Sequence, residues 1–160
     1  MRDTRRRGGF TLIELVITLA IVGLLATSAV PLASLIAKRD KEEQLRTALR
    51  EIRLALDAYH EAAQQGHIKR ELGDSGYPPD LKSLYQGVED IASEKKARLY
   101  FLRRIPRDPF YPDGQAAADD TWGLRSYQSP PDDPQPGEDV FDVYSYSRDK
   151  GLNGVAYRDW

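Results

Sequence analysis

The stretch GFTLIELVITLAIVGLLATSAVP, residues 9–31, contains one charged side chain, Glu14, in an otherwise uncharged and largely apolar run. Uncharged sequence continues from Leu15 to Ala37, which is long enough for a helix that needs roughly 20 residues to cross the hydrocarbon core of a bilayer. An ionised carboxylate inside such a segment is costly unless another group compensates its charge. We therefore expect a membrane-spanning helix in which Glu14 has a specific partner.

Residues 1–9 form a basic flank, with four arginines and one aspartate. By the positive-inside rule this flank stays in the cytoplasm, and the chain beyond the helix lies on the outer side of the membrane. A conventional secretory signal would be cut after the apolar run, near the small residues 26–29. Here Gly8 and Gly9 give a side-chain-free backbone before Phe10, which suits a narrow protease cleft. The sequence thus predicts cleavage ahead of the apolar run.

Residues 9–31 resemble the N-terminus of type IV pilins and pseudopilins in four features: the glycine, the aromatic residue after it, the glutamate at this offset and the proline that ends the run. The resemblance implies that a prepilin peptidase cuts between Gly9 and Phe10 and methylates the new N-terminus. It also implies assembly roles for Glu14 and for Pro31, which bends a helix because it lacks a backbone donor. The alternatives are a plain signal anchor and a tolerated proline kink.

We expect Glu14 to pair with the amino group of Phe10, chiefly that of a neighbouring subunit. Cleavage creates a cationic N-terminus at the start of the helix, and two opposite charges that enter a low-dielectric fibre core together largely compensate each other. The alternative is a role within one subunit, since a glutamate in the first turn also interacts favourably with the positive end of its own helix.

The sequence KRDKEEQLRTALREIRLALDAYHEAAQQG, residues 38–66, continues the helix. Its apolar side chains recur at spacings of three and four and form one stripe: Leu45, Ala48, Leu49, Ile52, Ala55, Leu56, Tyr59 and Ala62. We expect this stripe to pack on the C-terminal part of the chain and the helix to end before Gly66. Glu42 and Arg46 lie one turn apart and are expected to form a weak ion pair. Coiled-coil dimerisation is the alternative for the stripe, although fewer than three clear heptads support it.

The rest of the chain predicts a small antiparallel sheet. Asp80 is expected to cap a short helix. Strands are expected in TWGLRSYQS and DVFDVYSYS, residues 121–129 and 139–147, with a period-two pattern in the second and a proline-rich loop between them. The predicted fold class is therefore α+β, with a long N-terminal helix packed on a small C-terminal antiparallel β-sheet head. The resemblance to pilins implies the same arrangement.

The second half of the chain extends the resemblance. The segments YPPDLKSL, LRRIPRDPF, WGLRSY, DVFDVYSYS and GLNGVAYRDW resemble, in this order, the landmarks of the major pseudopilins of type II secretion systems. One departure is that residues 110–121 intervene between the Asp-Pro turn and the Trp-Gly strand. The resemblance divides the chain into a cleaved leader (1–9), a transmembrane and polymerisation half of the helix (10–37), an amphipathic half (38–66) and a periplasmic head (67–160).

The resemblance also raises calcium as a cofactor, because the best-known major pseudopilins bind calcium in an acidic C-terminal loop. Calcium takes about six to eight oxygen ligands, and the final loop here is shorter and less acidic than theirs. Four side chains could supply part of such a shell: Asp142, Asp149, Asn153 and Asp159. The alternative is a solvated turn that is closed by Gly151, Gly154 and the packing of Trp160, with no cofactor.

Composition argues against other classes of function. The 160 residues include no cysteine, which excludes a thiol nucleophile, a thiolate metal site and any disulfide. A net charge of −2 gives no basis for a nucleic-acid partner. The two histidines, His60 and His67, flank the end of the predicted helix and are expected at the surface, and no serine lies in a nucleophile motif. We therefore expect no enzyme.

The resemblance implies a structural subunit of a type II secretion pseudopilus, a short helical periplasmic fibre that drives export of folded proteins. Implied partners are further copies of the chain, a prepilin peptidase, minor pseudopilins and an inner-membrane assembly platform with a cytoplasmic ATPase. The implied location is the bacterial inner membrane, crossed once, with the N-terminus cytoplasmic before processing and the head periplasmic. The alternatives are a type IV pilin of a surface pilus for adhesion or motility, and a membrane-anchored binding module that never polymerises.

Overall fold

The computed structural model describes residues 10–160, without the side chains of residues 27–31. The described residues form one long helix followed by seven short elements, in this order: α1 (Leu12–Gln64), α2 (Lys82–Gln86), β1 (Val88–Glu89), β2 (Arg98–Leu99), the 3-10 helix η1 (Asp119–Thr121), β3 (Trp122–Arg125), β4 (Asp142–Ser145) and the 3-10 helix η2 (Tyr157–Asp159). The chain divides into two compact units, residues 1–40 and 41–160, and α1 contributes to both.

The long helix ends where the sequence predicts. Gly66 has a φ of 82°, a left-handed conformation that glycine adopts without steric strain. The amides of Gly66 and His67 donate to the carbonyls of Ala63 and Ala62 at 3.3 and 3.0 Å, which is the hydrogen-bond pattern of a Schellman cap. The predicted stop at Gly66 is confirmed.

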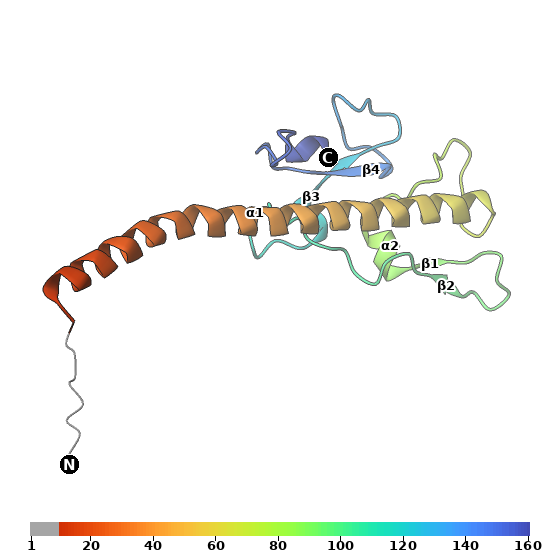
Figure 1. Ribbon diagram of the computed structural model, residues 1–160. Helices are drawn as coiled ribbons and strands as arrows, with labels where there is room; N and C mark the ends of the chain where they lie inside the picture. The colour runs from red at the N-terminus through yellow and green to blue at the C-terminus, as the bar shows by residue number, and fades with distance from the viewer. Residues whose placement is uncertain (1–9) are drawn as a thin grey trace, which may run out of the picture. The chain divides into compact units, whose positions relative to one another are not determined.

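The core of the second unit lies between α1 and the segments that run along it (Figure 1). Seven members of the predicted stripe are buried: Leu45, Ala48, Leu49, Ile52, Ala55, Leu56 and Tyr59. They belong to one apolar cluster with Leu84, Trp122, Val143 and Tyr157 of the head. The stripe is therefore covered by the chain's own head, as predicted, and the basis for the coiled-coil alternative is removed.

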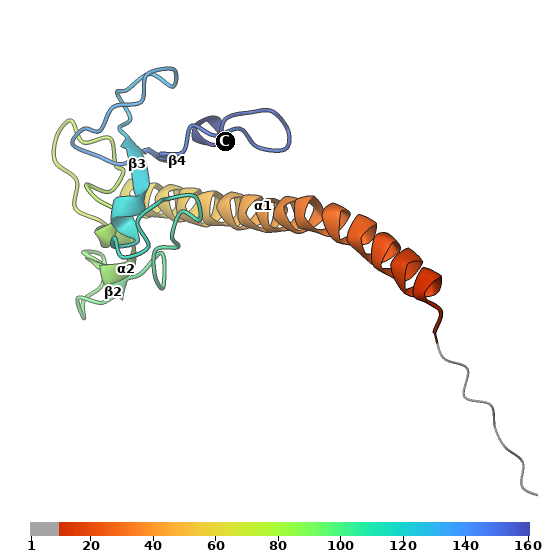
Figure 2. The same ribbon diagram turned by 90° about the vertical axis from the view of Figure 1, so that its left-hand side faces the viewer.

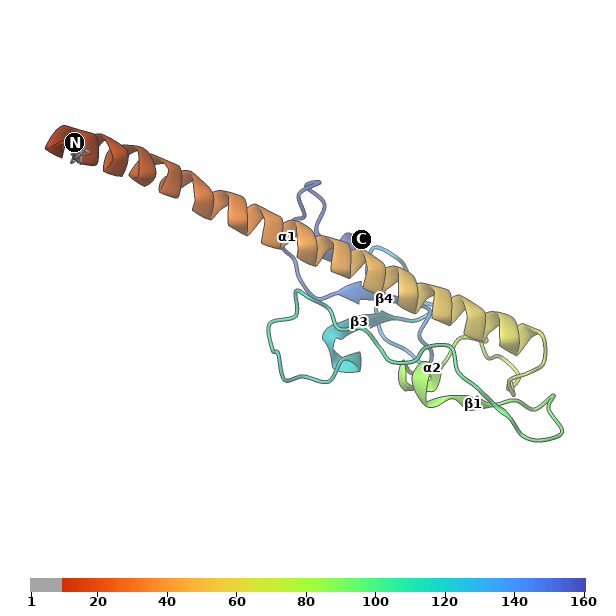
Figure 3. The ribbon, with the colours of Figure 1, turned by 60° about the horizontal axis from the view of Figure 1, so that its bottom comes forward.

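The head contains two small antiparallel sheets, β1 with β2 and β3 with β4. In the second sheet Trp122 lies opposite Ser145, and Figure 3 shows the two strands side by side. Both strands are shorter than predicted. β3 ends at Arg125 because the amide of Ser126 donates to the carbonyl of Gln135 at 3.0 Å, and the chain turns there into the proline-rich loop. The predicted α+β class, with a long helix and an antiparallel head, is confirmed.

The short helix α2 lies near the C-terminal end of α1 (Figure 2). One carboxylate oxygen of Asp80 accepts hydrogen bonds from the amide and the hydroxyl of Ser83, both at 2.8 Å. Leu81 and Leu84 are buried in the core. The predicted capped helix is therefore present, and its apolar face joins the core as expected.

Candidate functional site

The start of α1 holds two of the predicted processing and assembly residues. The Oγ1 atom of Thr11 accepts a hydrogen bond from the amide of Glu14 at 3.3 Å and so caps the first turn. Phe10 and Glu14 are both exposed. Gly9, the other residue of the predicted cleavage site, lies outside the described residues. The capping role of Thr11 was not predicted, although a threonine three residues before a glutamate is the signature of a capping box.

The first turns of α1 expose apolar side chains on every face. Large apolar residues between positions 10 and 25 are at least half exposed, among them Leu12 at 83% and Leu24 at 71%. Contiguous apolar surface of this extent marks a protein or membrane interaction site. Pro31 falls within the bounds of α1, but its side chain lies outside those that the structure describes, so the bend predicted there remains a prediction.

Among the residues that the structure describes, no helix is both long enough and apolar enough to qualify as a candidate membrane span.

Glu42 connects α1 to the C-terminal loop. Its Oε1 atom accepts hydrogen bonds from the amide of Leu152 at 2.8 Å and from the hydroxyl of Tyr157 at 2.9 Å. Glu42 is only 6% exposed, so it is not the surface residue that an ion pair with Arg46 would require. The guanidinium of Arg46 instead lies 4.5 Å from the ring centre of Trp160. Both side chains therefore bind the C-terminal loop rather than each other.

The contact with Glu42 predicts a loss of stability at high pH. Burial raises the pKa of the Tyr157 hydroxyl above its ordinary value of 10.0, and the hydrogen bond to Glu42 raises it further. Below that ordinary value the contribution to stability is complete, and it is lost as the pH rises toward the pKa of the folded state. Between about pH 8 and pH 11, we expect the melting temperature of Tyr157→Phe to fall less than that of the wild type.

Exposed Tyr127 provides the matched control for this measurement. Tyr127→Phe should follow the wild-type pH profile. Identical pH profiles for Tyr157→Phe and the wild type would show that Tyr157 is not responsible for the alkaline loss.

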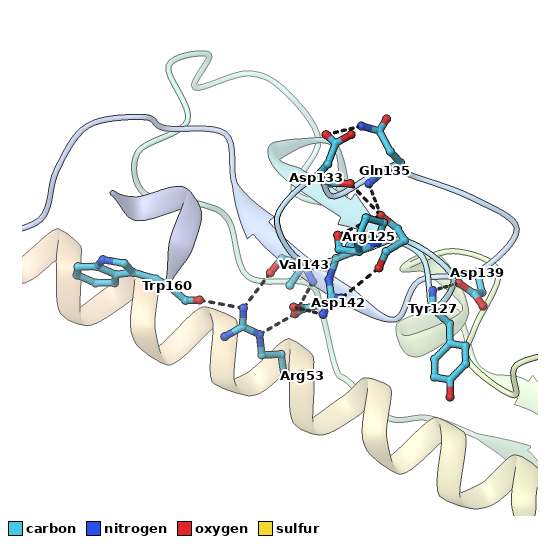
Figure 4. Close-up of polar contacts among 11 residues, drawn as sticks. Arg53, Arg125, Tyr127, Asp133, Gln135, Asp139, Asp142, Val143 and Trp160 are labelled. Carbon is cyan, nitrogen blue, oxygen red and sulfur yellow. Dashed lines mark hydrogen bonds and ion pairs between the residues drawn. The ribbon is translucent and has the colours of Figure 1, made fainter. Parts of the chain in front are cut away.

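Arg53 makes the second connection between α1 and the C-terminal part of the head (Figure 4). Its Nε atom donates to Oδ1 of Asp142 at 2.8 Å, and its Nη2 atom donates to the carbonyls of Val143 at 3.2 Å and Trp160 at 3.0 Å. A second guanidinium, that of Arg125, donates to Oδ2 of Asp142 at 3.2 Å. Both carboxylate oxygens of Asp142 are therefore bound by arginine.

The other calcium candidates lie in a loop that is closed by its own backbone. The amide of Gly154 donates to the carbonyl of Gly151 at 2.9 Å, and the amide of Gly151 donates to the carbonyl of Val155 at 2.8 Å. Asn153 Oδ1 accepts from the amide of Val155 at 3.1 Å. A Cβ at Gly151 would lie 2.5 Å from the ring of Trp160, so glycine permits the ring to pack there. The loop is closed by the predicted glycines and tryptophan.

These contacts test whether the four candidates fit calcium. Within residues 10–160, no three acidic or histidine side chains are grouped to hold a metal ion. Asp142 lies on β4 with arginine on both oxygens, while Asp159 lies in η2 and Asp149 contributes a carbonyl to the amide of Tyr157. The arrangement does not fit a calcium shell built on Asp142, and we derive no function through that ion.

Asp108 explains why the Asp-Pro turn and the final strand occur together as landmarks. This buried carboxylate accepts hydrogen bonds from the hydroxyl of Ser145 at 2.6 Å and from the amide of Phe110 at 2.8 Å. The ring nitrogen of Trp122 donates to the carbonyl of Pro106 at 2.9 Å. The turn therefore fixes both strands of the second sheet, and the inserted residues 110–121 extend from it.

The histidines are engaged in packing and hydrogen bonding. The ring of His60 stacks on Tyr77 with centres 4.2 Å apart, and His67 Nδ1 lies 3.0 Å from Asp90 Oδ1. Both residues are partly exposed, as expected for surface positions, and each contacts a loop near the end of α1. An open pocket of about 540 Å³ beside Tyr111 and Tyr146 contains a serine but has no histidine in its lining. The geometry gives no support for a catalytic triad in the described chain.

Comparisons with known proteins place this arrangement in a family. The model of the prokaryotic N-terminal methylation motif matches residues 4–30. A type II secretion system core protein G of Klebsiella michiganensis is 30% identical over 145 residues, which cover 87% of this chain and 92% of that protein. The chain belongs to the type II secretion core protein G family. Core protein G of Klebsiella pneumoniae is 31% identical over 117 residues, 69% of this chain and 74% of that protein.

A more distant member of the core protein G family, from Aeromonas hydrophila, is 27% identical over 153 residues, 78% of this chain and 98% of that protein. No solved structure gives a significant match. Together with the methylation motif, the core protein G relatives confirm the predicted resemblance to type II secretion pseudopilins. Members of this family are structural pseudopilins, which agrees with the prediction of a protein without enzymatic activity.

Proposed function

We propose that this core protein G homologue is the repeating subunit of a periplasmic pseudopilus that drives export of folded proteins. The observation that carries the proposal is the exposed apolar surface of residues 10–26, which lies within the matched methylation motif of residues 4–30. Such a surface needs lipid before assembly and neighbouring subunits afterwards. The head is covered by its own helix stripe and remains outside the apolar fibre core.

In this proposal residues 10–37 anchor the subunit in the bacterial inner membrane, with the leader cytoplasmic and the head periplasmic. A prepilin peptidase processes the chain, and an inner-membrane platform with a cytoplasmic ATPase stacks it together with minor pseudopilins. Pro31 supplies a bend when the helix leaves the lipid. The names of the relatives favour this function over a surface pilus or a non-polymerising anchored module.

The contacts at the start of α1 support a role of Glu14 between subunits. Thr11 caps the first turn, and the Glu14 carboxylate is exposed on the same helix end. After cleavage, the amino group of Phe10 would be a cation within the same short segment. When helices pack, Glu14 can pair with this amino group on a neighbouring subunit, so that neither charge is isolated in a low dielectric. The pair therefore stabilises one axial register between subunits.

Processing predicts a defined mass. Intact-mass analysis of the membrane-extracted protein should show a chain that starts at Phe10 and carries one added methyl group, because Gly8 and Gly9 precede the apolar run. Gly9→Leu should leave the leader attached, since the larger side chain would obstruct the protease cleft, and Gly23→Ala provides a control in open space within the helix. A mature start after Ala26 would indicate a conventional secreted protein instead.

A deletion strain distinguishes the secretion function from its alternatives. Loss of the gene should leave exported proteins folded in the periplasm, with surface adhesion and motility unchanged. A loss of motility or adhesion with normal secretion would assign the chain to a surface pilus.

A further inference from the structure

One arginine of α1 gathers oxygen atoms of the kind that a calcium ion would gather. The Arg53 guanidinium contacts one carboxylate oxygen, on Asp142, and two backbone carbonyls, on Val143 and Trp160 (Figure 4). Calcium uses the same two types of ligand. These oxygens come from β4 and from the last residue of the C-terminal segment, so Arg53 fastens both to the helix. Arg53 thus links these two segments to α1, as a bound structural ion would.

The charges around Asp142 oppose a further cation. Arg53 and Arg125 bind its two oxygens at 2.8 and 3.2 Å, which places two positive groups around one negative group. Arg125 is also held in place, since its guanidinium lies 4.6 Å from the ring centre of Phe141 and its side chain is only 17% exposed. A divalent ion at this carboxylate would have to displace a guanidinium and would be repelled by the other.

We propose that Arg53 takes the place of a calcium ion in this head, and that the folded head is independent of calcium. The specificity of the replacement lies in the fork geometry of the guanidinium. A planar group with several fixed donors reaches three oxygens at once, which an ammonium on a flexible stem does not. This role of Arg53 in the stability of the head does not depend on fibre assembly.

Thermal unfolding of the full chain in detergent tests whether the folded head is independent of calcium. Buried Trp122 lies within residues 41–160, so its fluorescence reports the unfolding of that unit. An ion that binds only the folded state raises the melting temperature by mass action. We expect melts in excess chelator and in millimolar calcium to coincide to within about 1 °C. A reproducible rise with calcium would overturn the proposal.

Substitutions test whether Arg53 holds β4 and the C-terminal segment on α1. Arg53→Met should lower the melting temperature by about 5 °C or more, because it leaves a partly buried carboxylate and two carbonyls with fewer donors. Arg53→Lys should recover only part of this loss. Arg50→Met, at an exposed position one turn earlier on α1, is the matched control and should melt like the wild type.

A double-mutant cycle separates the contact from general destabilisation. Asp142→Asn and Arg53→Met should each lower the melting temperature, and the double variant should lose clearly less than the sum, because both remove the same interaction. Additive losses would show that Arg53 and Asp142 are not coupled. Equal melting of Arg53→Met and Arg50→Met would show that Arg53 does not hold the segment.

Discussion

Glu14→Ala is expected to abolish assembly while leaving cleavage and membrane insertion intact. The substitution makes the segment more apolar, which favours insertion, and it preserves Thr11, whose side chain caps the first turn. It leaves the amino group of Phe10 without a partner when helices pack, a loss of several kcal/mol for a buried charge. We expect a drop in cross-linkable multimers and in secretion of at least roughly 100-fold, since each 1.4 kcal/mol is about tenfold.

Thr18→Val is the matched control for this substitution. The Thr18 hydroxyl donates to the carbonyl of Leu15 within its own helix, at 2.9 Å, and it carries no charge. Its removal should leave assembly near the wild-type level. If Glu14→Ala subunits assemble as well as the wild type, Glu14 acts only on its own helix end.

Glu42→Ala is expected to give the largest loss of stability among single substitutions outside the apolar core. The change leaves the amide of Leu152 and the hydroxyl of Tyr157 without their charged acceptor in a buried position. Hydrogen bonds to charged groups contribute roughly 1.5–3 kcal/mol, so the expected loss is about 3 kcal/mol. The melting temperature of the head should fall by about 10 °C.

Glu43→Ala provides the control, because Glu43 is the exposed neighbour of the same residue type on α1. It should melt within about 1 °C of the wild type, as is usual for surface substitutions. Proteolysis at the C-terminal loop should accelerate in Glu42→Ala but not in Glu43→Ala. Equal melting of the two variants would show that Glu42 does not hold the loop.

The elements with local sequence signals were predicted well. Periodicity and Gly66 gave the stripe and the end of α1, since both depend on residues within a few positions of each other. Alternation located β4, and β3 was also predicted, but β3 ends at Arg125 because the amide of Ser126 bonds the carbonyl of Gln135 instead of continuing the strand pairing. The strands β1 and β2 were not predicted, since each has two residues and no periodic pattern.

The polar contacts that fasten the head were not predicted. Arg53 reaches Asp142 across 89 positions and Glu42 reaches Tyr157 across 115, and no local pattern reports such pairs. From the sequence alone, Glu42 was expected to pair with Arg46, and Asp142 was a calcium candidate. A carboxylate suits these roles as well as the long-range hydrogen bonds that the structure shows. Burial decides between the roles, and it depends on the folded chain. Thr11 is different: its capping signal is local and could have been found.

In the proposed fibre, residues 10–26 of one copy pack on those of the next copy in a heterologous, head-to-tail arrangement. The chain has no cysteine, so engineered cysteines report contacts without background. A single cysteine cross-links at most two copies, whereas two cysteines that meet across a heterologous interface produce a ladder of multimers. Val16→Cys would be combined with a second cysteine scanned through positions 19–26, in cells that contain the secretion machinery. We expect ladders above the dimer for at least one pair of cysteines, and Glu14→Ala should eliminate them. If no pair gives a species larger than the dimer, residues 10–26 do not pack in this way.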